Sequence, residues 1–240
     1  MRLLVCIDDT DDLESKGTGE IAEELCGIVN EKRFGTTSAV SRHQLFVDDR
    51  IPYTSHNSSM CFEVNLHQSD YYKDMLYLFE EHLKHEKADT SDPGLCICDI
   101  KKVDIQTVIN YGKRTKVEVI TKSEAYKLAK EQEIFLKEYG GTGDGIIGAL
   151  AGIGLRLSGQ DGRFKGKHKI EEGYYTVEEL KTQLKIDEVM LHGTSNILEG
   201  GRVYVSGKVK SVLMFHKRVL PVFQTETGYA NCKKEQLRRY

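Results

Sequence analysis

Four aspartates follow the first apolar run of the chain within five positions. They are Asp8, Asp9, Asp11 and Asp12. Carboxylates this close repel one another unless a positive charge lies between them. Oxygen ligands suit magnesium, which usually takes one or two carboxylates and completes its shell with water and phosphate oxygens. The loop therefore indicates a magnesium–nucleotide complex. The alternative is a solvated turn that caps the next helix.

Thr18 stands where the sequence predicts the start of that helix. A threonine there commonly serves as the N-cap, with its hydroxyl bonded to the backbone. The same hydroxyl can also meet a phosphate, because helix N-termini favour anions. Spacing by itself leaves both roles open.

A glycine-rich segment, Gly140 to Gly159, is the second candidate motif. Gly143, Gly145 and Gly148 satisfy G-x-G-x-x-G, which taken alone is a weak sign of a dinucleotide site. Such a site needs a strand immediately before it, whereas the preceding residues predict a helix. A glycine-rich turn that leads into a helix still presents backbone N–H groups, which favour phosphate. The alternative is a tight helix–helix contact, which Gly148 and Gly152 allow by their small size.

The elements that position these residues follow from hydrophobic periodicity. Residues 3–7 predict a buried strand and residues 19–30 a helix, so the aspartates lie in a strand–loop–helix unit. In α/β proteins the carboxyl end of a parallel strand faces the ligand-binding crevice, and we expect the aspartates there. Further predicted strands are 37–47, 60–66, 95–99 and short segments from 202 onward. Further predicted helices are 70–85, 104–113, 123–138, from 145 onward and 178–184.

Composition limits the class of protein. The 240 residues suffice for one large domain or two small ones. With 34 basic and 37 acidic residues the net charge is −3, which argues against nucleic-acid binding by bulk electrostatics but leaves room for a local basic patch. The segment QDGRFKGKHK, residues 160–169, is a basic loop. We expect a cytoplasmic protein without a membrane partner, because there is no signal-peptide pattern and the least charged segment has eleven residues.

The six cysteines form no paired C-x-x-C sets, so we expect buried reduced thiols and no zinc ribbon. Cys96 and Cys98 alternate on a predicted strand and would face the same side. His82 and His85 lie three apart on a predicted helix, which permits a metal site. The alternative is a solvated helix face.

The motifs in this order resemble the archaeal tRNA(Ile) agmatinylcytidine synthetase family, which modifies an anticodon cytidine with agmatine and uses ATP. The resemblance covers roughly residues 1–157. The matching pieces are I-D-D-T-D at Ile7 to Asp11, I-P-Y at Ile51 to Tyr53 with Asn57 after it, a T/S-x-P-G turn at Ser91 to Gly94, and a G-x-G-[LI]-I-G-A-L-A helix start at Gly143 to Ala151.

This resemblance implies an α+β (α/β) fold with a kinase-like, ATP-binding α/β domain. That domain would be discontinuous, at residues 1–57 and 113–190. A ferredoxin-like domain would be inserted at residues 58–112, where two predicted strands flank a helix. A short β-rich segment, residues 191–240, would follow.

The resemblance also implies roles for individual residues. The aspartates would hold Mg²⁺ and the ATP phosphates, and the threonine would accept phosphate. The glycines would hold phosphates, and Asn57 and Arg42 would contribute to nucleotide binding. The predicted catalytic residues are Asp8, Asp9, Asp11 and Thr18, and the same three aspartates are the predicted metal ligands. The predicted cofactor-binding residues are Gly143, Gly145, Gly148, Asn57 and Arg42.

The chain departs from the family pattern in its charges. Asp144 and His56 stand where the family has basic residues, and Lys16, Arg42 or Arg163 would have to compensate. No part of the chain matches the OB-fold and zinc ribbon with which the family holds tRNA.

We therefore expect an ATP- and Mg²⁺-dependent phosphoryl-transfer or ligase-type enzyme. Its acceptor would be a nucleoside, a tRNA or a small molecule. The alternatives are a nucleotide-binding or regulatory module without turnover, and the catalytic subunit of a split tRNA-modifying enzyme. A homodimer is also possible, because the sequence does not determine the oligomeric state.

Overall fold

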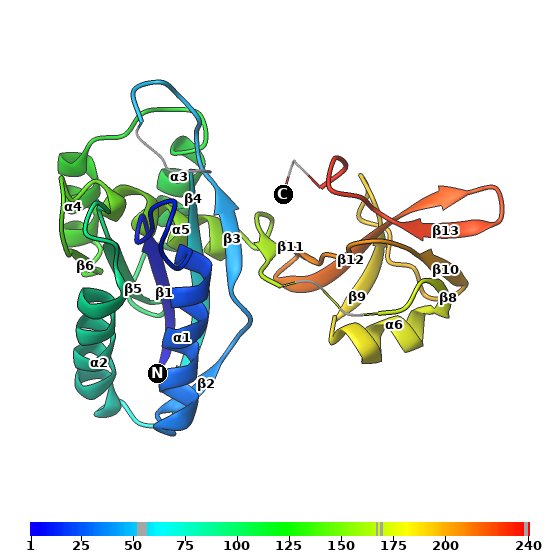
Figure 1. Cartoon of the computed structure of the whole chain (residues 1–240), viewed down its shortest axis with the longest axis horizontal. Helices are drawn as coiled ribbons and strands as arrows, with labels where there is room; N and C mark the ends of the chain where they lie inside the picture. The colour runs from blue at the N-terminus through cyan, green and yellow to red at the C-terminus, as the bar shows by residue number, and fades with distance from the viewer. Residues whose placement is uncertain (52–56, 167, 169, 238–239) are drawn as a thin grey trace. The chain divides into compact units, whose positions relative to one another are not determined.

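The computed structural model describes residues 1–51, 57–166, 168, 170–237 and 240. The chain is a mixed α/β protein that divides into two compact units, Met1–Ser158 and Gly159–Tyr240 (Figure 1). Each unit is described by itself below. None of the helices among the described residues combines the length and the hydrophobicity that a membrane span requires.

The first unit is built around β1 (Arg2–Asp8), which confirms the predicted buried strand. β1 pairs antiparallel with β4 (Ser58–Leu66) on one side and with β5 (Gly94–Asp99) on the other. The prediction that this strand belongs to a parallel sheet is therefore wrong. The outer strands, all antiparallel to their neighbours, are β2 (Gly35–Thr37) and β3 (Ser41–Gln44) beside β4, and β6 (Phe135–Glu138) beside β5.

Helices cover both faces of this sheet (Figure 1). Side chains alternate along a strand, so Leu3, Val5 and Ile7 of β1 join one core cluster, while Leu4 and Cys6 join the other. The first cluster packs against α1 and α2, and the second against α3, α4 and α5. The helices are α1 (Thr18–Glu31), α2 (Tyr71–Glu86), α3 (Ile105–Arg114), α4 (Lys122–Glu131) and α5 (Gly145–Ser158).

The tight helix contact suggested by the glycines of α5 exists, but at another position. A Cβ on Gly154 would lie 2.2 Å from the carbonyl oxygen of Val108, and one on Gly112 would lie 2.8 Å from that of Ala151. These two glycines let the backbones of α3 and α5 approach closely. Gly152 instead faces side chains of the sheet.

The predicted helix over residues 123–138 is only partly correct. α4 ends at Glu131, Glu133 adopts a left-handed conformation with φ 52°, and residues 135–138 form β6. Pairing of β6 with β5 along the sheet edge overrides the helical spacing of this segment. A strand therefore does precede the glycine-rich loop.

The second unit is mainly β-structure, with two core clusters of its own. Its elements are β7 (Arg163–Phe164), β8 (Gly173–Thr176), α6 (Val177–Leu184), β9 (Glu188–Leu191), β10 (Arg202–Val205), β11 (Val212–Met214), β12 (Lys217–Thr225) and β13 (Gly228–Asn231).

The observed division between the units, after Ser158, differs from the predicted last boundary after residue 190. β9 pairs in parallel with β12, with Val219 opposite Glu188, so residues 188–191 belong to the β-rich unit. Inside the first unit, β4 and β5 both lie in the predicted insert 58–112, yet each pairs directly with β1. The ferredoxin-like and kinase-like descriptions stay predictions.

Candidate functional site

The aspartate loop begins where β1 ends. Asp8 is the last residue of the strand and is buried, with 8% of its surface exposed. Asp9 follows in a left-handed conformation, φ 52°, which aspartate tolerates better than most residues. Strained backbone of this kind is frequent at functional sites. The chain then turns back toward α1.

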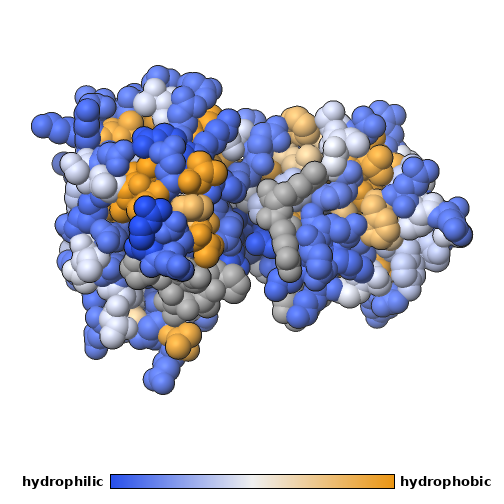
Figure 2. Space-filling model, turned by 90° about the horizontal axis from the view of Figure 1, so that it is seen from above, coloured by the Kyte–Doolittle hydropathy of each residue, from blue (hydrophilic) through white to orange (hydrophobic). Residues whose placement is uncertain are grey.

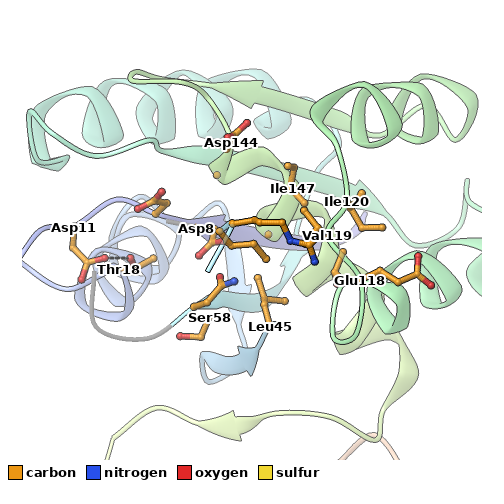
Figure 3. Close-up of a pocket in the computed structure, with 17 residues that line it drawn as sticks. Asp8, Asp11, Thr18, Leu45, Ser58, Glu118, Val119, Ile120, Asp144 and Ile147 are labelled. Atoms are coloured by element: carbon orange, nitrogen blue, oxygen red, sulfur yellow. Dashed lines mark hydrogen bonds between the residues drawn. The ribbon is translucent and has the colours of Figure 1, made fainter. Parts of the chain in front are cut away.

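A pocket of about 140 Å³ opens at this loop. One side of it is polar, with Asp8, Asp11 and Thr18, and the other carries apolar side chains (Figure 3). Hydrophobic and hydrophilic residues also lie side by side on the face of the first unit that Figure 2 shows. The described lining residues are Asp8, Asp9, Asp11, Thr18, Leu45, Arg50, Ile51, Asn57, Ser58, Thr115, Glu118, Val119, Ile120, Asp144, Gly145, Ile147 and Gly148.

The carboxylates of this pocket lie close to one another and to further aspartates. Burial raises the pKa of Asp8 well above its ordinary value, and the charge of Asp9 adds to this effect. Burial also raises the pKa of Asp9 to about 6, helped by Asp92, Asp11 and Asp144. No described lysine, arginine or histidine contributes an opposing effect on either group. The site therefore favours a bound cation.

Thr18 is the first residue of α1, and Gly17 occupies the N-cap position without a side-chain cap. Of the two roles that the spacing left open, N-capping by Thr18 is therefore excluded. Its hydroxyl donates to Oδ1 of Asp11 at 2.5 Å and lies 3.4 Å from the backbone nitrogen of Thr10. The hydroxyl is positioned beside a carboxylate that can take its proton.

The glycine-rich loop contributes part of the predicted set. Gly145 and Gly148 line the pocket, whereas Gly143 lies outside the lining. A Cβ on Gly148 would lie 1.7 Å from Oδ2 of Asp8, so only glycine allows α5 to pack on that carboxylate. A Cβ on Gly145 would lie 2.0 Å from the carbonyl oxygen of Asp92. The first function of these glycines is close packing around the aspartate loop.

The segment Ser91 to Gly94, which leads into β5, joins the two loops. Asp92 accepts from the backbone nitrogen and the hydroxyl of Thr142, both at 2.5 Å, which fixes the glycine-rich loop. On the other side, the backbone nitrogen of Ala88 donates to the carbonyl oxygen of Thr10 at 3.0 Å. Three motifs that are distant in sequence therefore meet at one site.

Asn57 and Arg42 have different positions. Asn57 lines the pocket, and its side-chain amide donates to the carbonyl oxygen of Phe46 at 2.6 Å. Arg42 lies outside the lining and donates through Nε to the hydroxyl of Ser58, which does line the pocket. Arg42 can therefore act on the pocket through Ser58. The Pro52, Tyr53 and His56 positions of the I-P-Y segment lie outside the described residues.

Sequence reasoning missed the apolar wall and the segment after α3. Leu45, Val119, Ile120 and Ile147 supply apolar contacts, and Glu118 adds a further carboxylate (Figure 3). These residues carry no motif, because their role depends only on which loops meet. The one signal available was the run of apolar residues between two predicted helices.

The residues present fit a magnesium ion in the way that proteins usually hold it with a nucleotide. Among the described residues no group of three or more histidine, cysteine, aspartate or glutamate side chains converges as a ready metal cage. Magnesium commonly takes only one or two carboxylates and completes its shell with water and phosphate. Asp8 and Asp9 suit that use. His82 and His85 bond instead to Glu24 and Glu86, and all six cysteines are buried free thiols, as expected.

No protein-family model and no curated protein matches the sequence. Solved structures do match the fold. A tRNA fluorescent labeling enzyme shares 23% identity at a TM-score of 0.55. The isoleucine-tRNA agmatidine synthetase TiaS, in complex with its tRNA and ATP, shares 23% at 0.56. The complex of TiaS with tRNA, AMPCPP and agmatine shares 22% at 0.54.

Each of these likenesses covers 64% of this chain and 36% of the compared chain. The chain thus spans about a third of the length of these proteins. At this identity the likeness concerns the fold, and the predicted resemblance is confirmed at that level. Over the part that is covered, the chain has a TiaS-like fold.

Proposed function

We propose that the chain binds ATP with Mg²⁺ in this pocket and uses it in a phosphoryl-transfer or ligase-type reaction. The observation that carries the proposal is the pocket itself. It brings Asp8, Asp9 and Asp11 together with Thr18 and opposes them to an apolar wall. In keeping with the resemblance, we assign the first unit as a kinase-like domain with a ferredoxin-like insert.

The two sides of the pocket suit the two ends of a nucleotide. Leu45, Val119 and Ile147 offer apolar surface to a base, while the aspartates face the phosphates through the metal. Phosphate and carboxylate repel each other directly, so Mg²⁺ between them is required for binding. When bound, the metal screens the charge that develops on the transferring phosphoryl group.

Thr18 and Asp11 form the reactive pair of the proposal. Asp11 accepts the proton of the Thr18 hydroxyl, whose oxygen either orients the terminal phosphate or attacks it. In an attack the new O–P bond forms as the bond between the terminal phosphorus and its bridging oxygen breaks, and ADP leaves. The acceptor after this step is a nucleoside in tRNA or a small molecule. The tRNA alternative is supported by the fold, since TiaS was solved with tRNA, ATP and agmatine.

A second candidate function is nucleotide binding without turnover. Arg50 is the one cation among the described lining residues, and it is paired with Asp48 at 2.6 Å. Asp144 adds negative charge to the glycine-rich loop. A pocket with so little positive charge is poorly equipped to stabilise a transferring phosphoryl group, which favours a regulatory module.

The test is incubation of the purified chain with γ-labelled ATP and Mg²⁺, with and without bulk tRNA. We expect label on the protein or release of ADP, AMP or pyrophosphate. Thr18→Ala and Asp9→Asn should each reduce these products at least tenfold, because they remove the attacking hydroxyl and a metal ligand. Asp89→Asn, an exposed acid outside the pocket, is the matched control.

Binding measured by calorimetry separates the two candidates. ATP binding that needs Mg²⁺ and Asp9, without any product over hours in the presence of tRNA, would favour the regulatory module. Absence of Mg²⁺-dependent ATP binding would refute both.

A further inference from the structure

Asp12 is the fourth aspartate of the loop that follows β1, and it lies outside the described lining of the pocket. Its carboxylate accepts hydrogen bonds from within the loop and from a distant segment. The backbone nitrogens of Glu14 and Ser15 donate to Oδ1 at 3.0 and 2.9 Å. The hydroxyl of Thr90, which follows α2 in the chain, donates to Oδ2 at 3.1 Å. Asp12 therefore shapes the aspartate loop and ties it to the residues after α2.

Lys16 lies near the end of the same loop. Its Nζ donates to Oε1 of Glu24 on α1 at 2.7 Å and to Oε2 of Glu86 on α2 at 2.6 Å. The side chains of these two glutamates are only 29% and 19% exposed. Lys16 also lies outside the described lining of the pocket. Its ammonium group therefore bridges two helices and does not supply the positive charge that Asp144 fails to provide.

Each glutamate of this bridge has a second partner on α2. Oε2 of Glu24 lies 2.9 Å from Nε2 of His82, and Oε1 of Glu86 lies 2.8 Å from Nδ1 of His85. The hydrogen bond from Lys16 lowers the pKa of Glu86 to about 2, and the bond to His85 adds to this effect. A single exposed ion pair contributes little, whereas several charges joined in a network can hold a loop in place.

The residues at the end of α2 and after it contact both loops of the site. The backbone nitrogen of Ala88 donates to the carbonyl oxygen of Thr10 in the aspartate loop at 3.0 Å. Asp92, on the same segment, accepts from the backbone nitrogen and the hydroxyl of Thr142 in the glycine-rich loop. Residues 86–92 therefore anchor the aspartate loop on one side and the glycine-rich loop on the other.

We propose that Asp12 and Lys16 form a latch that orders the aspartate loop and thereby positions the Thr18 hydroxyl. The latch consists of the two ion pairs of Lys16 and the hydrogen bonds of Asp12. Gly17 alone separates Lys16 from Thr18 in the sequence. Movement at this end of the loop therefore displaces the hydroxyl from Asp11, to which it donates. The reactive role of the hydroxyl rests on the proposed function, whereas the ordering of the loop does not.

Hydrogen exchange followed by mass spectrometry tests the ordering of the loop in the full chain without a ligand. Lys16→Met should raise the exchange rate of residues 9–17 about tenfold and leave that of α5 unchanged, because loss of the latch opens the loop locally. Lys16→Arg should exchange like the unmodified chain, since a guanidinium can bridge the same carboxylates. The matched control is Lys84→Met, which removes a lysine that pairs with Glu81 on α2 at 2.7 Å. Unchanged exchange of the loop in Lys16→Met would overturn the inference.

Product formation from γ-labelled ATP and Mg²⁺ tests the consequence for the Thr18 hydroxyl. Lys16→Met should lower the rate constant about tenfold and leave the dissociation constant of Mg²⁺–ATP within about threefold, because a positioning residue acts on the reaction and not on binding. Lys16→Arg should restore the rate. If Lys16 were a phosphate ligand, the loss would appear in the dissociation constant, and Glu86→Gln would tighten binding by releasing the lysine. Either of these results, or an unaltered rate in Lys16→Met, would contradict the latch.

A double-substitution cycle identifies the contact itself. Glu86→Gln should lower the rate as Lys16→Met does, and the combined variant should be no slower than Lys16→Met, because both changes break the same ion pair. Fully additive losses would count against the latch. Absence of product from the unmodified chain would refute turnover in the proposed function, and the exchange measurements would then decide the latch by themselves.

Discussion

At the scale of single residues, the site depends on one contact between a glycine and a carboxylate. Gly148 of α5 leaves room for the buried side chain of Asp8, and the same glycine lines the pocket. The carboxyl group of Asp8 is thereby held against α5, and no described residue supplies an opposing positive charge. This arrangement stores repulsion that a bound metal ion would relieve.

Replacement of Gly148 tests this contact. In Gly148→Ala the new methyl group collides with Asp8, so we expect Mg²⁺–ATP binding to weaken at least tenfold and the unfolding free energy to fall by about 1–3 kcal/mol. Gly27→Ala is the matched control, because its nearest neighbour would lie 4.0 Å away. It should stabilise α1 by roughly 0.5–1 kcal/mol. Calorimetry and urea unfolding measure both effects, and unaltered binding by Gly148→Ala would contradict the contact.

The second residue-scale prediction concerns pH. The pKa of Asp9 rises from 3.8 to about 6 on folding, so the folded chain binds more protons than the unfolded chain between these values. This group therefore destabilises the metal-free protein as pH rises from about 4 to 6, and the penalty persists above that range.

Comparison with Asp9→Asn isolates the effect of this carboxylate. Between pH 4 and 7, the unmodified chain should lose on the order of 1 kcal/mol relative to the variant, after allowance for solvent screening of a partly exposed group. Mg²⁺ at pH 7 should restore more stability to the unmodified chain than to the variant. Parallel pH profiles of the two proteins in urea unfolding would count against a raised pKa.

At the scale of elements, α5 is the centre of the first unit. It packs on β1 and β5 and also touches α3 with almost no side chains between the backbones. The apolar sequence of α5 explains its burial on all sides. Its glycines determine which neighbours come close.

Gly154→Ala tests the contact between α3 and α5. The new Cβ would lie 2.2 Å from a backbone oxygen, which cannot rotate away as a side chain can. We expect a loss of about 2–3 kcal/mol in unfolding free energy. Urea unfolding against the Gly27→Ala control measures it, and a loss below about 0.5 kcal/mol would show that the helices separate easily.

At the scale of the whole molecule, the two units differ in charge and in core. Each has buried hydrophobic clusters of its own, so each meets the requirement for folding alone. Residues 1–158 carry a net charge of −8 (19 basic and 27 acidic residues) and residues 159–240 one of +5 (15 basic and 10 acidic residues). All described residues that line the proposed nucleotide pocket belong to the first, acidic unit.

Separate expression of residues 1–158 and 159–240 tests this division. Residues 1–158 should fold and retain Mg²⁺-dependent ATP binding within about threefold, because they contain every described residue that lines the pocket. Residues 159–240 should fold on their own core clusters and show no such binding. Calorimetry measures ATP binding and circular dichroism measures folding, and loss of ATP binding by a folded 1–158 fragment would contradict the assignment.

The sequence by itself determined the local elements and the acidic loop. The strand that leads to Asp8 and the helix that begins at Thr18 both followed from periodicity, because the spacing of apolar residues depends on neighbours in the chain. The pattern of aspartates and glycines also indicated which loops carry chemistry. These are properties of short segments.

The tertiary structure decided everything that depends on distant partners. It made β1 antiparallel to both neighbours, converted residues 135–138 from a predicted helix into an edge strand, and placed Thr18 against Asp11 instead of the helix cap. It also joined Val119 and Ile147 to the pocket. Strand pairing and loop packing are long-range interactions, and no local pattern encodes which surfaces they bring together.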